Sequence, residues 1–184
     1  MDLEFNIRPG KDGYIRSGAT KIYHTKSEDI LTANVFGHLK YIKTIDWIEI
    51  LINDYSEIYP SNNFKLSFWK EIPPPKNIKI SEGNTEVDVI IESSNTVIFI
   101  ECKYHAEASE GTTGSNKIRK PRNQIIRNID VGLNYSFEVD KKFFFTYITT
   151  TKKDIPIEIS RYKNVNTIVK DIKDTVSTMC KKFH

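Results

Sequence analysis

Two acidic residues on neighbouring predicted strands, Asp88 and Glu101, are the part of this sequence best suited to chemistry. The runs 85–92 and 96–103 are rich in β-branched residues, and the short polar segment Ser93–Asn95 separates them. Serine and asparagine favour tight turns, because their side chains bond to the local backbone and asparagine tolerates positive φ. The pattern therefore predicts a β-hairpin that carries one carboxylate on each strand.

The register of this hairpin decides what the carboxylates can do. A symmetric turn places Glu101 opposite Asp88, and it places Lys103 opposite Glu86. Two opposed carboxylates have Cβ atoms about 5 Å apart and repel each other by about 3 kcal/mol at an effective dielectric constant of ~20. Such a pair requires a proton, a cation or a metal ion to compensate it.

Lys103 supplies one cation on the side of the sheet that Glu101 faces. A hard divalent ion such as Mg²⁺ would supply the rest, since it prefers carboxylate and carbonyl oxygens together with water. Carboxylates around a divalent ion are typical of phosphodiester cleavage. The alternative is a pair of charges at the end of a sheet, each neutralised by a lysine or arginine from a helix.

The order of these residues resembles the PD-(D/E)XK nuclease superfamily. An acidic residue on one strand is followed on the next by Glu-x-Lys after an apolar approach, residues 98–103, and the resemblance spans roughly residues 27–150. It implies a restriction-endonuclease-like α/β fold, in which helices flank both faces of a mixed central sheet with an αβββαβ core. It also implies hydrolysis of DNA phosphodiester bonds by a metal-activated water, leaving 5′-phosphate and 3′-hydroxyl ends.

The resemblance assigns roles to the hairpin residues. Asp88 and Glu101 would bind Mg²⁺, for which Mn²⁺ can substitute, and the backbone carbonyl of Cys102 would be a further ligand. Lys103 would orient or deprotonate the attacking water and offset the charge of the phosphate in the transition state. Its alternative role is as the counterion of Glu86 or Glu101.

Two further residues belong to predicted helices. Glu28 follows the N-cap Ser27 and lies on the apolar stripe of its helix. It would hold the metal through water or bind a second ion; alternatively, it is an acid favoured by the helix dipole. Gln124 lies in the helix after the hairpin, where one branch of the superfamily has Gln followed four residues later by Tyr, and here that position is Asn128. Gln124 would bind the attacking water or a phosphate oxygen, or it is a surface amide.

Basic residues gather before and within the helix that carries Gln124, although the net charge of the whole chain is only +3. A local basic segment can hold a phosphate backbone that nearby carboxylates would repel. The alternative for each residue is a solvated helix start. The predicted nucleic-acid-binding residues are Lys117, Arg119, Lys120, Arg122 and Arg127.

The substrate and the partners stay open at this point. DNA is the expected substrate, whereas RNA or a branched or single-stranded structure is the alternative. A domain of the same fold that binds nucleic acid without turnover is a third interpretation. Small nuclease domains commonly pair to cut two strands, so a homodimer is expected, and a separate targeting subunit is compatible with the absence of a recognition module.

Length and composition predict one domain over residues 1–184, since 39% of the residues are hydrophobic. No apolar run of ~18 residues and no N-terminal signal is visible, so we expect no membrane association and a cytoplasmic protein. Cys102 and Cys180 have no metal-ligand spacing, which argues against zinc and against a disulfide framework.

The predicted elements follow from hydrophobic periodicity and from breakers such as Pro60 and Pro73. We expect an irregular arm over residues 1–26 with a short strand at its end, a core over 27–150, and a C-terminal helix within 160–184. The core comprises helices 28–41 and 45–58, strand 63–72, the hairpin, a helix that begins near Pro121, and strand 142–150.

Overall fold

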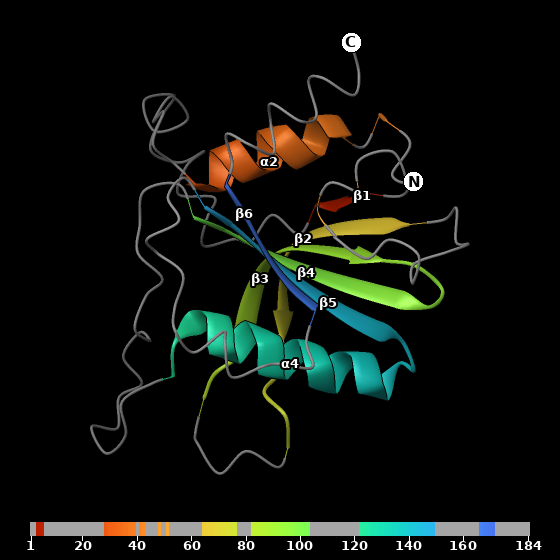
Figure 1. Cartoon of the computed structure of the whole chain (residues 1–184), viewed down its shortest axis with the longest axis vertical. Coiled ribbons are helices and arrows are strands. Elements are labelled where there is room, and N and C mark those ends of the chain that lie inside the picture. The colour runs from red at the N-terminus through yellow and green to blue at the C-terminus, as the bar shows by residue number, and fades with distance from the viewer. Residues whose placement is uncertain are drawn as a thin grey trace.

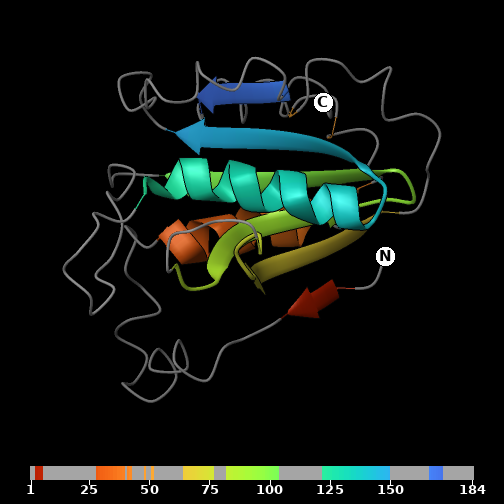
Figure 2. The ribbon, with the colours of Figure 1, turned by 90° about the horizontal axis from the view of Figure 1, so that it is seen from below.

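A six-stranded mixed β-sheet lies between two helices, α2 (Glu28–Leu39) and α4 (Gln124–Glu138), one on each face (Figures 1 and 2). The computed structural model describes residues 3–5, 28–39, 41–42, 48, 51, 64–76, 82–103, 122–149 and 166–171. This architecture confirms the predicted α/β class with helices on both faces of a mixed sheet.

The strands lie side by side in the order in which they occur in the chain. They are β1 (Leu3–Phe5), β2 (Lys65–Ile72), β3 (Thr85–Glu92), β4 (Thr96–Lys103), β5 (Lys142–Thr149) and β6 (Asn166–Asp171). The central strand β3 is antiparallel to both of its neighbours, β2 and β4, whereas β1 pairs with β2, β5 with β4 and β6 with β5 in parallel. In Figure 2, α4 lies in front of the sheet and α2 lies behind it.

Alternate residues of β4 enter two separate cores, because successive side chains of a strand point to opposite faces. The α2-face core contains Ile98 and Ile100 together with Phe36 and Leu39 of α2. The α4-face core contains Val97 and Phe99 together with Ile125 and Ile129 of α4. By the same alternation, Glu101 and Lys103 belong to the face that α4 covers.

Gly132 allows α4 to lie close to the sheet. A Cβ atom added to this residue would overlap the ring of Phe143 on β5. The Phe143 ring in turn packs edge-on against Phe99, with ring centroids 5.3 Å apart. This close approach at the middle of α4 sets the distance between the N-terminal half of the helix and β4.

The turn of the predicted hairpin forms, and the ladder pairs Ile90 with Phe99 in the register of a symmetric turn. Ser93 N–H donates to Thr96 O (2.9 Å), and Thr96 N–H donates to Ser93 Oγ (3.1 Å). Asn95 does not adopt positive φ, so that part of the predicted mechanism is wrong. The Ser93 side chain closes the turn instead, since its hydroxyl also donates to Asn95 Oδ1 (3.0 Å).

Ser93→Ala is expected to lower the free energy of unfolding by about 1 kcal/mol, because the buried Thr96 N–H loses a hydrogen-bond partner. Denaturant unfolding monitored by circular dichroism measures this change. Ser94→Ala is the matched control, since Ser94 is the exposed neighbour in the same turn. Equal stability of the two variants would contradict the role given to Ser93.

The faces of β2 reverse at Trp69. Phe68 and Trp69 both pack with the α2-face core, whereas Ile72 packs in the α4-face core and Lys70 Nζ donates to the hydroxyl of Tyr135 on α4 (3.2 Å). In a regular strand, Phe68, Lys70 and Ile72 would share one face. Trp69 has a φ of 48°, a left-handed conformation that bulky residues rarely adopt.

The faces of β3 reverse at the neighbouring position. Val89 packs in the α2-face core, whereas Val87, only two residues away, packs in the α4-face core. The register of the β2–β3 ladder is the same before and after this point, but the ladder skips the facing residues Trp69 and Asp88. The regular pleat is therefore broken beside the first acidic residue of the predicted site.

One predicted element is wrong. Residues 166–171 form strand β6 beside β5, where a C-terminal helix was expected. This segment contains β-branched residues that pack well on a pleated surface, and pairing with β5 overrides the helical spacing. In the N-terminal arm the structure describes strand β1, at the start of the arm, and the end of the arm, where a short strand was predicted, lies outside the described residues. Of the predicted helix 45–58, the structure describes Ile48 and Leu51, which are helical and fully buried.

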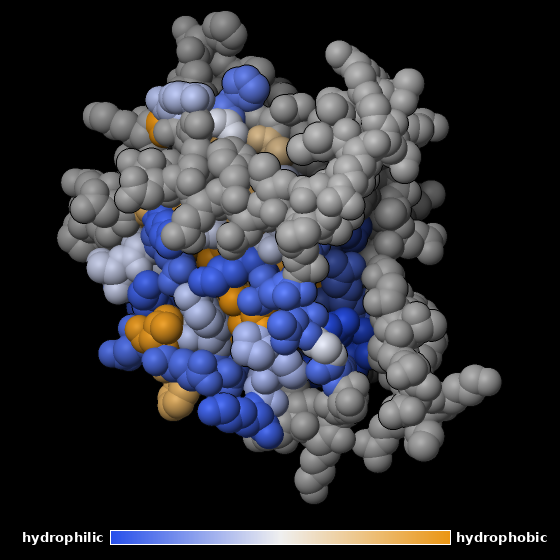
Figure 3. All heavy atoms as spheres, turned by 180° about the vertical axis from the view of Figure 1, so that it is seen from behind, coloured by the Kyte–Doolittle hydropathy of each residue, from blue (hydrophilic) through white to orange (hydrophobic). Residues whose placement is uncertain are grey.

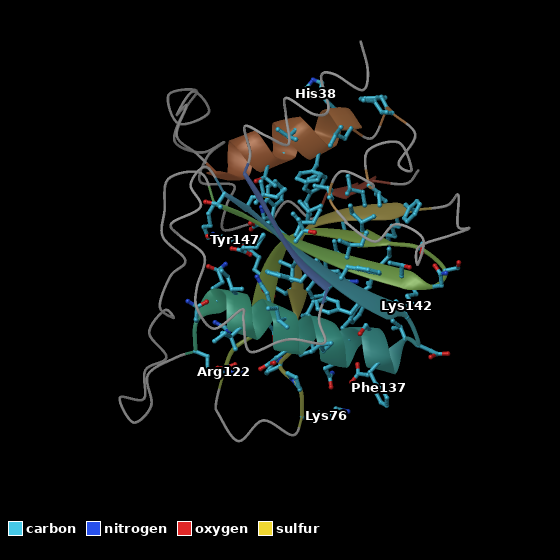
Figure 4. All side chains as sticks on the ribbon, viewed as in Figure 1. His38, Lys76, Arg122, Phe137, Lys142 and Tyr147 are labelled. Carbon is cyan, nitrogen blue, oxygen red and sulfur yellow. The ribbon has the colours of Figure 1, made fainter. Side chains whose placement is uncertain are left out.

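Among the described residues, no helix has the length and apolar character needed to cross a membrane. The described surface in Figure 3 is mostly hydrophilic, with hydrophobic residues exposed in small groups. Phe137, which is 87% exposed, projects from the C-terminal end of α4 (Figure 4).

Candidate acidic site on the central hairpin

Glu101 is a buried carboxylate held by two neighbours. Its side chain is 0% exposed, and Lys103 Nζ lies 2.8 Å from Glu101 Oε1. Asn128, also fully buried, donates through Nδ2 to Glu101 Oε2 at 2.7 Å. One carboxylate oxygen thus faces a cation from the same strand, while the other is fixed by a neutral donor from α4.

Asp88 lies where β3 and β4 part. The last pair of the ladder on this side is Val89 with Ile100, so the predicted direct pairing of Asp88 with Glu101 does not form. The Cys102 N–H instead donates to Asp88 Oδ2 at 2.8 Å. The carboxylate of Asp88 replaces a main-chain partner of β4, and the ladder ends at Val89 with Ile100 although both strands continue beyond this pair.

The predicted pairing of Lys103 with Glu86 is also wrong for the same reason. Glu86 pairs with Glu71 of β2, on the side of β3 away from the hairpin partner. Lys103 pairs with Thr149 of β5. Its side chain, 11% exposed, lies against Glu101, which is the second of the two counterion roles expected for it.

Cys102 interacts with both acidic residues. Burial raises the pKa of its thiol well above the usual range, the charge of Asp88 and then that of Glu101 raise it further, and a hydrogen bond with Thr32 of α2 opposes the rise. At neutral pH the thiol therefore stays protonated. The charges of both carboxylates therefore act on this thiol, and the main chain of Cys102 is hydrogen-bonded to Asp88.

The two helix residues of the predicted site lie at helix starts near this centre. Glu28 is the first residue of α2, one turn before Thr32, and its side chain lies outside the described part of the structure. Gln124 is the first residue of α4 and lies one turn before Asn128 on the same helical face. The N-cap residue of α4 is Asn123, whose Oδ1 accepts a hydrogen bond from the N–H of Ile125 at 2.9 Å.

Sequence reasoning missed Asn128 and Thr32 as neighbours of the acidic residues. The available signal was spacing, because Asn128 follows Gln124 by four residues and Thr32 follows Glu28 by four residues. Residues four apart share a helical face. A buried polar residue one turn after a predicted site residue is therefore a candidate for the same site.

Arg122 forms ion pairs inside the fold. Its guanidinium binds Glu82 through two parallel bonds, Nε to Oε1 at 2.8 Å and Nη2 to Oε2 at 2.9 Å, and Nη1 also pairs with Asp130. These contacts raise the pKa of Arg122 above its already high value. Figure 4 shows Arg122 just before α4, on the same side of the molecule as Tyr147.

Arg127 also contacts the segment before β3. Its Nη2 donates to Gly83 O (3.1 Å), Asn84 O (3.2 Å) and Thr85 Oγ1 (3.3 Å). Nucleic-acid binding by Arg122 and Arg127 stays a prediction, since both guanidinium groups also fasten the start of β3 to α4. The other three predicted binding residues, Lys117, Arg119 and Lys120, lie outside the described residues.

The Glu82–Arg122 pair gives the stability of the fold a pH dependence. The hydrogen bond from Arg122 lowers the pKa of Glu82 below 4.5, with burial opposing the shift. A carboxyl group with a lowered folded-state pKa stabilises the fold above its unfolded pKa and loses that contribution as pH falls through the folded pKa. Glu82→Gln is therefore expected to lower stability at pH 7 by about 2 kcal/mol.

The stability difference between Glu82→Gln and the wild type should shrink below pH ~4.5. Denaturant unfolding at a series of pH values measures it. The matched control is Glu138→Gln, because Glu138 is exposed on the last turn of α4. A difference that is constant from neutral to acidic pH would contradict the ion-pair origin.

The donor set of the acidic centre suits a hard cation. Among the described residues no group of three or more His, Cys, Asp and Glu side chains could hold a metal, but Mg²⁺ is usually bound by only one or two protein carboxylates together with waters. Asn128 Oδ1 is buried and has no hydrogen-bond partner among these residues. A water held beside Glu101 would be a suitable donor to it.

Comparison of the chain with protein-family models, and with curated proteins, gives no match.

Proposed function

We propose that this protein is a divalent-cation-dependent nuclease of the restriction-endonuclease-like fold that hydrolyses DNA phosphodiester bonds. One observation carries the proposal. Each of the two acidic residues has one carboxylate oxygen fixed by a neutral N–H donor, Cys102 N–H for Asp88 and Asn128 Nδ2 for Glu101. Neutral donors orient a carboxylate without cancelling its charge, which suits a metal ligand better than a structural ion pair.

The arrangement of elements gives further support. The hairpin β3–β4 lies at the centre of a mixed sheet, with α2 on one face before it and α4 on the other face after it. This order agrees with the αβββαβ core that the sequence resemblance implies. The acidic residues stand where the pairing of β3 with β4 ends, so Asp88 and Glu101 are not joined to each other through the β3–β4 ladder.

In this proposal Asp88, Glu101 and the Cys102 carbonyl hold the divalent cation. When bound, the cation activates water and offsets phosphate charge. Lys103 Nζ, 2.8 Å from Glu101 Oε1 in this structure, exchanges that contact for the attacking water or a phosphate oxygen, where its charge stabilises the transition state. Gln124, one turn from Asn128, hydrogen-bonds the water or the phosphate.

The test is incubation of the purified protein with supercoiled plasmid, linear duplex DNA, single-stranded DNA and RNA, each with Mg²⁺, with Mn²⁺ and with a chelator. We expect cleavage of DNA that requires the cation. The Glu101→Gln variant, purified in parallel, excludes a contaminating nuclease. Cleavage of RNA alone would replace the substrate part of the proposal. No cleavage, together with no heat of Mn²⁺ binding by calorimetry, would overturn the nuclease proposal itself.

A further inference from the structure

Trp69 faces Asp88 across β2 and β3, because the register of this ladder is the same on both sides of the two residues. Its φ of 48° lies in the left-handed region, where a bulky side chain is strained. Strain of this kind persists only where the surrounding structure enforces it, and it clusters at functional sites. In the described structure the only other non-glycine residue with positive φ is Asp140, just after α4.

The ladders of β3 with β2 and with β4 are both interrupted at the position of Asp88. Toward β2 the ladder skips the facing residues Trp69 and Asp88, and toward β4 the ladder stops at Val89 with Ile100. The pleat of both β2 and β3 reverses at the same point. In a regular strand the side chain of Asp88 would stand perpendicular to the sheet, too far from the plane of β4 to accept a backbone N–H. It does accept the Cys102 N–H, at 2.8 Å.

We propose that Trp69 is a positioning residue for Asp88. Its left-handed conformation rotates the peptide plane of β2, so that the side chains of β2 change faces at this point. Because β3 is paired with β2, the side chains of β3 change faces at the neighbouring position. The Asp88 carboxylate then lies against β4, beside Glu101, where it replaces a main-chain bond. The effect on Asp88 stands on the backbone geometry alone, while its consequence for metal affinity rests on the proposed nuclease function.

The test compares Trp69→Gly with Trp69→Val. Both substitutions remove the indole, but glycine adopts positive φ freely, whereas a β-branched residue strongly resists it. The first readout is hydrogen exchange of the Cys102 amide by NMR, which needs no metal. We expect Trp69→Gly to keep the protection of this amide against exchange. In Trp69→Val the protection should fall about ten- to a hundredfold, because this is the range for loss of a hydrogen bond to a charged acceptor.

The second readout is Mn²⁺ affinity by calorimetry. We expect Trp69→Gly to bind as the wild type does and Trp69→Val to bind about ten- to a hundredfold more weakly, as for the loss of a group that orients a metal ligand. If Trp69→Val does not fold, Trp69→Asn and Trp69→Leu provide a second pair of nearly equal size, in which asparagine tolerates positive φ.

Equal protection of the Cys102 amide in the two members of a pair would overturn the role of Trp69, whether both keep the bond to Asp88 or both lose it. A wild type that binds no Mn²⁺ would instead overturn the proposed function. The difference in amide exchange would still be measurable in that case, so the two failures are distinguishable.

Discussion

Glu101→Gln is expected to lower the rate of cation-dependent DNA cleavage by on the order of a thousandfold, equivalent to several kcal/mol of transition-state stabilisation. The amide has the size of the carboxylate and can still contact Asn128, but it carries no charge for a cation. Because Glu101 is 0% exposed and lies within 2.8 Å of Lys103, the substitution also releases Lys103 from its counterion. Single-turnover cleavage of a labelled duplex measures the effect.

The control for this variant is Glu138→Gln, which removes the same charge from an exposed position. It should cleave at the rate of the wild type. Circular dichroism would show that Glu101→Gln is folded, and calorimetry with Mn²⁺ would show whether cation binding is lost together with cleavage. A Glu101→Gln protein that cuts as fast as the wild type would remove Glu101 from the mechanism.

Lys103→Met is expected to lower the free energy of unfolding in the absence of divalent cations by about 3–5 kcal/mol. The substitution keeps the apolar stem but removes the ammonium group that lies 2.8 Å from the buried Glu101 carboxylate. When one partner of a buried ion pair is removed, the other charge stays buried without compensation. The free-energy penalty of that unpaired charge is larger than the net stabilisation that the intact pair provides. Denaturant unfolding in the presence of a chelator measures the loss.

Two comparisons isolate the charge effect. In the double variant with Glu101→Gln, most of the stability should return, because neither charge is then buried alone. Lys142→Met is the matched control, since Lys142 is exposed at the start of β5. Under the proposed function, Mn²⁺ should raise the melting temperature of Lys103→Met more than that of the wild type. Stability of Lys103→Met equal to that of Lys142→Met would contradict this account.

The central hairpin could be predicted from the sequence because its information is local. Two β-branched runs and a serine–asparagine turn determine the strands, the register and the face of each residue near the turn. The end of the hairpin could not be predicted in this way. Alternation with period two assumes negative φ throughout, and the positive φ of Trp69 lies on a different strand from the acidic residues that it affects.

The remaining differences come from tertiary contacts. The segment 166–171 has apolar spacing compatible with a helix, and only the free edge of β5 decides in favour of a strand. Asn128 is buried in α4, and its bond to Glu101 requires the distance between α4 and β4 that Gly132 permits. Asp88, Glu101 and Lys103 stay predicted site residues, and the sequence did not indicate the donors that orient the two carboxylates.

The short turn at Ser93–Asn95 brings together the two strands that carry Asp88 and Glu101 at a low cost in chain entropy. The loop between β3 and β4 is far shorter than the crossover from Lys103 to Lys142 that joins β4 to β5, and the loop-closure relation makes the difference on the order of 2 kcal/mol. Repulsion between Asp88 and Glu101 is weak while water surrounds the open hairpin, since a high dielectric screens it. The repulsion becomes strong only once α4 covers Glu101, and the same packing event supplies the amide of Asn128 that holds the carboxylate.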